Sequence, residues 1–155
     1  MSEERKFTIE LDQQDGYEFK VNFNLQGVED LMVDETPPVG QGKGPNPSRM
    51  LAVAAANCLS ASLLFCVTKN APPGGSLHTR ATCTLTRNAG GRLRIGNIHV
   101  TLKVNGELEE AARMKRCLDL FEDFCVVTAS LREGFPIDVE VVGEAGQRLY
   151  SSSGA

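Results

Sequence analysis

One long apolar segment constrains the fold of this chain more than any other feature. Residues 50–67 read MLAVAAANCLSASLLFCV, in which only one Asn and two Ser are polar. Asn46-Pro47 precede the segment, and because Asn caps free N–H groups and Pro suits the first helical position, a helix is predicted to start there. The segment reaches the length of a membrane span, but its many alanines and the lack of flanking aromatic residues argue against one. We therefore expect a buried central helix that is apolar on all sides.

The rest of the chain is patterned as strands, turns and two shorter helices. Helical spacing of apolar residues predicts an amphipathic helix over 107–121 and a shorter one over 124–132 that stops at Gly134. Apolar and polar residues alternate with the period of two that is typical of half-buried strands. This pattern predicts strands at 7–11, 17–25, 77–87, 93–104 and 137–142.

Turn signals connect these strands into hairpins. Asp15-Gly16 joins the first two strands, Asn88-Ala89-Gly90-Gly91 joins the second pair, and Pro72-Pro73-Gly74-Gly75 forms a turn after the long helix. Sequential hairpins, in place of alternating strand–helix units, predict an α+β fold with antiparallel sheets, in one domain over residues 1–155. The tail, 143–155, is expected to be frayed at its serine-rich end.

A long loop leads into the apolar segment. Residues 34–47 hold four prolines and three glycines, so they can neither continue a sheet nor wind a helix. Loops of this length inside a compact domain are mostly functional or disordered, and the position before the central helix favours function.

Charge and cysteine content exclude several classes of function. The chain has 16 basic and 20 acidic side chains, with no basic run, which argues against a nucleic-acid or anionic-membrane partner. Its five cysteines cannot close into a complete disulfide set, and the charged start resembles no secretion signal. We expect a cytoplasmic protein whose thiols are free, catalytic or metal-binding in preference to bridged.

The cysteines are the main candidates for chemistry. Closely paired metal ligands such as C-x-x-C are absent from the sequence, as are phosphate-loop and dinucleotide motifs, so neither a metal nor a cofactor is predicted. Cys58 stands out because its helical neighbours are small and leave room for a ligand. A reactive Cys58 would need a cation or hydrogen-bond donors, and Arg49, Arg132 and Lys43 are the candidate cations. The expected role of three further cysteines is packing alone: these are Cys66, Cys83 and Cys117.

Three spacings together resemble the OsmC/Ohr family. Gly44-Pro45-Asn46-Pro47 precedes an Ala-rich helix in which Cys58 follows Pro47 by eleven positions, and Cys125 stands ahead of an Arg, a Gly and a terminal strand. The resemblance implies an intertwined homodimer with sites at its interface. It implies that Cys58 is the peroxidatic thiol that reduces an organic hydroperoxide, and that Cys125 is the resolving thiol. The disulfide formed between them would be opened by a dithiol reductant of the lipoyl type.

Two positions depart from the pattern of the best-known peroxidases of that family. In those peroxidases an acidic residue directly follows Asn-Pro and pairs with an Arg of the N-terminal hairpin. In this chain Ser48 follows Asn-Pro, and the first hairpin, 7–25, contains no Arg. Glu35, in a stretch that resembles the OsmC-like branch, could supply a carboxylate, with Arg49 or Arg132 as its cation. The first hypothesis is a cytoplasmic hydroperoxide reductase; the alternative is a non-catalytic or weakly active dimer that binds a small apolar or thiol-reactive ligand in the interface pocket. The first hypothesis places the Cα atoms of Cys58 and Cys125 within about 7 Å after modest movement.

Overall fold

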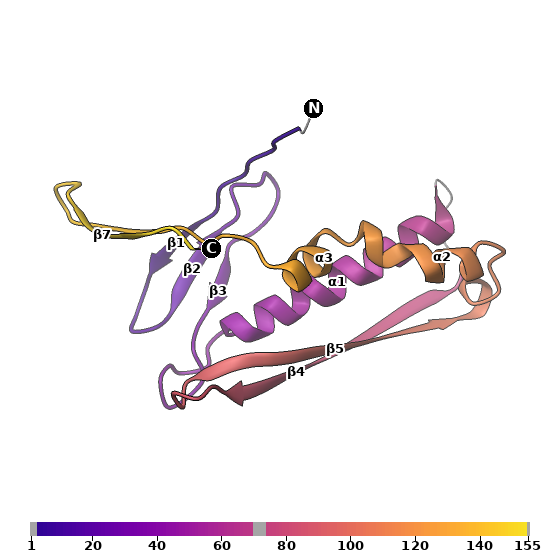
Figure 1. Cartoon of the computed structure of the whole chain (residues 1–155), viewed down its shortest axis with the longest axis horizontal. Coiled ribbons are helices and arrows are strands. Elements are labelled where there is room, and N and C mark those ends of the chain that lie inside the picture. Colours follow the sequence, from indigo (N-terminus) through magenta and orange to yellow (C-terminus); the bar gives the residue numbers. More distant parts are fainter. Residues whose placement is uncertain (1–2, 70–73, 155) are drawn as a thin grey trace. The chain divides into compact units, whose positions relative to one another are not determined.

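The structure, a computed structural model, describes residues 3–69 and 74–154 (Figure 1). It is a mixed α+β chain with three α-helices, and its β1–β2–β3 and β6–β7 sheets are antiparallel, as the sequence predicted. Pro72-Pro73 of one predicted turn lie outside the described residues. The elements in chain order are β1 (Glu10–Gln13), β2 (Phe19–Asn22), β3 (Leu31–Val33), α1 (Pro47–Thr68), β4 (Ser76–Arg87), β5 (Leu93–Asn105), η1 (Gly106–Leu108), α2 (Met114–Leu120), η2 (Phe121–Phe124), α3 (Val126–Glu133), β6 (Val139–Val142) and β7 (Arg148–Ser152).

The chain divides into two compact units. Unit 1 comprises Met1–Ala54 and Ala81–Val100, and unit 2 comprises Ala55–Arg80 and Thr101–Ala155. Helix α1 and the two strands β4 and β5 therefore each contribute residues to both units. The single domain expected over residues 1–155 stays a prediction.

A three-stranded sheet lies in unit 1. The predicted Asp15-Gly16 turn connects β1 to β2, with the N–H of Glu18 donating to the carbonyl of Asp15 at 2.9 Å. Gly16 adopts a φ of 57°, a conformation that costs glycine little. The observed β1 begins three residues later than predicted, at Glu10, where its pairing with β2 begins opposite Asn22.

The loop before α1 is held by a buried carboxylate. Backbone N–H groups of Glu35, Gln41 and Lys43 donate to Asp34 at 2.8–3.1 Å. The hydrogen bond from Lys43 is the largest cause that lowers the pKa of Asp34, against the opposing effect of burial. A Cβ at Gly40 would collide with the Asp34 carboxylate and the Glu35 carbonyl, so the tight approach requires glycine. The loop is thus ordered around Asp34.

Helix α1 starts where the sequence predicted. The side-chain oxygen of Asn46 accepts the N–H of Arg49 at 3.1 Å, as an N-cap does. The helix is long and apolar enough to pass a length-and-composition test for a membrane span, a test that core helices of soluble proteins also pass. The prediction that this helix is buried on all sides was wrong within this chain. Leu59 and Leu63 are buried, whereas Val53 is 60% exposed and Phe65 is 66% exposed.

The β4–β5 hairpin forms as predicted. Its turn is organised by Asn88, whose side-chain oxygen accepts the N–H groups of Gly90 and Arg92, each at 3.0 Å. Gly91 has a φ of 76°, which few other residues adopt at low cost.

The helix predicted over 107–121 is broken into η1, a turn and α2. In a continuous helix, Leu108 and Cys117 would lie about two and a half turns apart, on opposite faces. Both are almost completely buried in the core of unit 2, so the backbone changes its course between them. The N–H of Met114 accordingly bonds to the carbonyl of Ala111, three residues earlier, at 2.9 Å. That core contains Leu63, Cys66, Val67, Leu108, Met114 and Cys117.

The end of the chain is more ordered than predicted. Strand β7 pairs with β6 in antiparallel register, with Val139 opposite Ser152 and Val141 opposite Tyr150. The fraying expected for the serine-rich end was therefore wrong at Ser151 and Ser152. The turn is closed between Gly143 and Gly146, and Gly146 has a φ of 82°.

Candidate functional site

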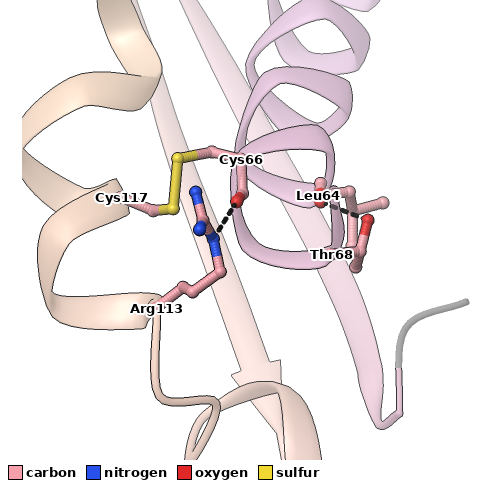
Figure 2. Close-up of a disulfide and its surroundings, with 5 residues drawn as sticks. All are labelled: Leu64, Cys66, Thr68, Arg113 and Cys117. Carbon is pink, nitrogen blue, oxygen red and sulfur yellow. Dashed lines mark hydrogen bonds between the residues drawn. A yellow bond between two sulfur atoms is a disulfide. The ribbon is translucent and has the colours of Figure 1, made fainter. Parts of the chain in front are cut away.

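The first notable feature of unit 2 is a disulfide between Cys66 and Cys117 (Figure 2). It joins the C-terminal part of α1 to α2, with a Cα–Cα distance of 5.7 Å. The expectation that both residues are unbridged packing cysteines was wrong, because the broken helix turns Cys117 toward α1. Arg113 adds a second link, since its Nε donates to the carbonyl oxygen of Cys66 at 3.1 Å. This pair forms part of the apolar core.

A second cysteine pair lies further toward the start of α1. Cys58 and Cys125 are both free, and their thiol groups share a hydrogen bond. Cys58 is partly exposed, whereas Cys125 is 0% exposed. The structure therefore brings together the two thiols that the sequence singled out. The third free thiol, Cys83, lies on β4 in unit 1.

The N-terminus of α3 surrounds both sulfurs with backbone donors. Cys125 is the N-cap of this helix, and its carbonyl oxygen accepts the N–H of Ala129 at 3.1 Å. The preceding N–H groups have no partner within the helix. Those of Val126 and Val127 donate to the Cys58 sulfur, and that of Thr128 donates to Cys125. Such donors favour a negatively charged sulfur.

Two buried hydroxyl groups complete the surroundings of Cys125. Ser62 lies one helical turn beyond Cys58 on α1, is buried, and donates to the Cys125 sulfur. The Thr128 hydroxyl is also buried and lies near enough to Cys125 to lower its pKa. The sequence analysis missed both hydroxyls. The spacing of Ser62 from Cys58, which puts the two on one helix face, was the available signal.

The two thiols differ in their ionisation. Burial is the main cause that raises the pKa of Cys58, and its hydrogen bond with Cys125 raises it further. Burial also acts to raise the pKa of Cys125, but the hydrogen bonds from Thr128, Cys58 and Ser62 outweigh it and lower that pKa.

Each cation considered for Cys58 has a polar partner within its own unit. Arg132 forms an exposed ion pair with Glu122 at 2.6 Å in unit 2. In unit 1, Lys43 pairs with Glu18 at 3.6 Å, and Arg49 donates to the Asn46 side chain at 3.3 Å. The dominant influences on the two thiols are burial, hydrogen bonds and each other.

Unit 1 contains open cavities of its own. One, of 380 Å³, is lined by residues that include Ser48, Arg49 and Cys83. Another, of 280 Å³, is lined by residues that include Glu35 and Arg94, so the carboxylate considered for the thiol site lines a cavity of unit 1. Within residues 3–69 and 74–154, no group of three or more His, Cys, Asp and Glu side chains is arranged to hold a metal ion.

Several solved structures share this fold. An OsmC-like protein of unknown function from Vibrio cholerae matches with a TM-score of 0.63 and 13% identity, over 82% of this chain and 94% of that one. A putative osmotic stress induced and detoxification response protein from Psychrobacter arcticus matches with a TM-score of 0.61 and 16% identity, over 84% and 91%. A hypothetical protein from Aquifex aeolicus matches with a TM-score of 0.62 and 15% identity, over 84% of this chain and 90% of that one.

No curated protein matches the sequence. The sequence pattern of OsmC-like proteins, in contrast, matches residues 40–140, a stretch that begins in the ordered loop and ends in β6. It includes Cys58 and Cys125 and the elements that hold them. By sequence pattern and by fold, the chain belongs to the OsmC-like protein family.

Proposed function

We propose that this protein is a thiol-dependent peroxidase that reduces organic hydroperoxides through Cys58 and Cys125. The observation that carries the proposal is the direct hydrogen bond between a partly exposed thiol and a buried one at the N-terminus of α3. The OsmC-like family is related to organic hydroperoxide resistance proteins, which supports this class of substrate.

The division of roles follows from exposure. Cys58 can meet a hydroperoxide and would attack its terminal oxygen, forming a sulfenic acid and releasing an alcohol. Cys125 is shielded from solvent, so its function is to attack that sulfenic acid, form the Cys58–Cys125 disulfide and release water. An external dithiol of the lipoyl type would then restore both thiols by exchange.

The active form is proposed to be a cytoplasmic homodimer. Proteins of the OsmC/Ohr family are generally homodimers. Several large apolar side chains of unit 2 are exposed in the single chain, which is what an apolar interface requires; they include Phe65, Leu118, Phe124, Val126, Phe135 and Ile137. Sedimentation at micromolar concentration tests this: a dimer is expected, and a monomer contradicts it.

A binding role is the alternative, and one observation favours it. The pKa of Cys58 is raised, so this thiol is mainly protonated near neutral pH unless another group takes its proton. In that case the dimer would bind a small apolar or thiol-reactive ligand without efficient turnover.

Counting thiols separates the two functions. The protein has three free thiols, Cys58, Cys83 and Cys125, and excess tert-butyl hydroperoxide should remove two of them. Cys58→Ser should abolish this loss, whereas the matched control Cys83→Ser should still lose two. If Cys58 stays reduced under excess hydroperoxide, the peroxidase function is wrong and the binding function is favoured.

A further inference from the structure

The two cysteine pairs of unit 2 connect the same two segments of the chain. On α1, Cys66 lies eight residues after Cys58. In the later segment, Cys125 lies eight residues after Cys117. The Cys66–Cys117 pair is bonded, and the thiols of the other pair share a hydrogen bond. The segment 117–125 therefore runs antiparallel to α1, with a covalent bond at one end and the thiol pair at the other.

Residues 118–124, all of which the structure describes, are held mainly at their two ends. In the single chain none of their side chains is buried, and Leu118 and Phe124 are each 57% exposed. Cys117 and Cys125, in contrast, are both 0% exposed. Helix α2 has seven residues, and helices this short are not stable on their own in water. The bond at Cys117 thus anchors this segment covalently to α1.

Neighbouring contacts fix the anchored end further. Cys117 packs in the core of unit 2 with Leu63 and Leu108. Arg113, one helical turn before Cys117, donates from its Nε to the carbonyl oxygen of Cys66 at 3.1 Å (Figure 2). This end of the segment therefore keeps its place on α1 when the other end moves.

The proposed reaction requires the other end to move. A disulfide needs its sulfur atoms about 2.0 Å apart, which is closer than a hydrogen bond brings them. Cys125 must therefore leave its buried position to bond with oxidised Cys58, and it gives up the hydrogen bond from the N–H of Thr128. During this step residues 118–124 connect Cys125 to the anchor on α1, and they limit how far it can move from Cys58.

We propose that the Cys66–Cys117 bond is a positioning element of the peroxidase, which keeps Cys125 within reach of Cys58 while the sulfenic acid is resolved. This inference rests on the proposed peroxidase function and gives the bonded pair a part in its second step. Through the bond, the path from Cys58 to Cys125 takes two stretches of eight residues, whereas without it the path takes the whole chain between them. Closing the shorter loop costs less entropy, and the dependence on length corresponds to an effective concentration of Cys125 about 10-fold higher.

The bonded pair keeps its oxidation state throughout the cycle. Cys58 attacks the terminal oxygen of the hydroperoxide, an S–O bond forms, the O–O bond breaks, and the alcohol leaves with the proton of the Cys58 thiol. Cys125 then attacks the sulfur of Cys58; an S–S bond forms, the S–O bond breaks, and the departing hydroxide takes the proton of the Cys125 thiol to become water. Cys58 and Cys125 together lose two electrons, and the hydroperoxide gains them.

The first experiment follows one turnover with tert-butyl hydroperoxide in a Cys83→Ser background, with rapid quenching, dimedone trapping and mass spectrometry. Replacing the bonded pair by Cys66→Ala with Cys117→Ala should leave the formation of Cys58 sulfenic acid unchanged, because that step uses Cys58 alone. Its conversion to the Cys58–Cys125 disulfide should slow about 10-fold. Excess hydroperoxide should accordingly convert more of Cys58 to the sulfinic acid. An unchanged rate of conversion would overturn the proposal.

A matched control separates positioning from stability. Leu108→Ala weakens the same buried core but keeps the bond, so conversion of the sulfenic acid should proceed at the parent's rate. Equal slowing in this variant would show that the bond acts through stability alone, and would overturn the positioning role. Circular dichroism verifies that each variant is folded. If the double alanine variant does not fold, Cys66→Val with Cys117→Ala, which fills more of the core, takes its place.

The approach of Cys125 can also be measured without a hydroperoxide. Dithiobis(nitrobenzoate) forms a mixed disulfide with Cys58 and releases one coloured nitrothiobenzoate, and attack by Cys125 on the Cys58 sulfur releases a second. If the parent consumes no hydroperoxide, yet removing the bond slows the second release, the peroxidase function fails and the positioning role stands. If the parent consumes hydroperoxide, and removing the bond changes neither the second release nor the conversion of the sulfenic acid, the function stands and the positioning role fails. A Cys58 that reacts with neither reagent contradicts both.

Discussion

Two cysteine pairs join α1 to later helices of unit 2, and they have opposite chemistry. Cys66 follows Cys58 by eight residues on α1, and Cys125 follows Cys117 by eight residues in the later segment. One pair, Cys66–Cys117, is bonded, whereas the other is free.

The surroundings of the two pairs explain the difference. The bonded pair packs among Leu63, Leu108 and Met114 in the core, where thiolates would be costly. The free pair meets the N-terminus of α3 and two hydroxyls, which stabilise a charged sulfur. A thiol's role in this protein is therefore decided by the donors around it. The predictions that follow test this contrast, from the largest expected effect to the smallest.

The largest effect concerns Cys58. Cys58→Ser should reduce hydroperoxide consumption to the background level, because a hydroxyl is a far weaker nucleophile than a thiolate near neutral pH. Consumption of tert-butyl hydroperoxide with a dithiol reductant measures this. Cys83→Ser, which removes a free thiol of unit 1, is the matched control and should keep full activity. Equal loss in both variants would show that the free pair has no special role.

The next effect concerns the bonded pair. The disulfide links residues separated by 51 positions, so its replacement by Cys66→Ala and Cys117→Ala should lower the free energy of unfolding by about 2–4 kcal/mol. Urea unfolding measures the change, and Cys83→Ala is the control. The initial rate of peroxide consumption, measured well below the unfolding midpoint, should be retained. A loss of that rate with the fold intact would contradict the separation of the two pairs.

A smaller effect concerns the pH dependence of the free pair. Hydrogen bonds lower the pKa of Cys125, so its charged form stabilises the native state above its unfolded pKa, and this contribution is lost as the pH falls through the lowered pKa. Ser62→Ala removes one donor and should raise that pKa. Thiolate absorbance in a Cys83→Ser background measures it. A shift to lower pH would contradict the contribution of Ser62.

The smallest effect concerns Arg113 beside the bonded pair. Arg113→Ala removes the hydrogen bond to the carbonyl of Cys66 and should lower the free energy of unfolding by about 1 kcal/mol. Urea unfolding detects this change. The pH profile of thiolate absorbance should be unaffected, since Arg113 acts at the other pair. A shifted profile would show that the two pairs are coupled through α1.

Local patterns predicted much of the fold because they act over a few residues. The Asn46 cap and the Asn88 turn depend on neighbouring backbone groups, and both were confirmed. The break between Leu108 and Cys117 could not be read from helical spacing, because it arises from burying both side chains in one core. Strand β7 was missed for a similar reason, since it depends on pairing with β6.

The sequence by itself determined which residues could do chemistry: it pointed to Cys58 and Cys125 through their spacing from Pro47 and from the terminal strand. Only the tertiary structure decided which thiols meet, because a broken helix brings Cys117 to Cys66. It also placed Ser62 and Thr128 beside Cys125. The reason is physical: spacing along a chain fixes the identity of a side chain and its local backbone, whereas thiol ionisation depends on burial and on donors from distant segments.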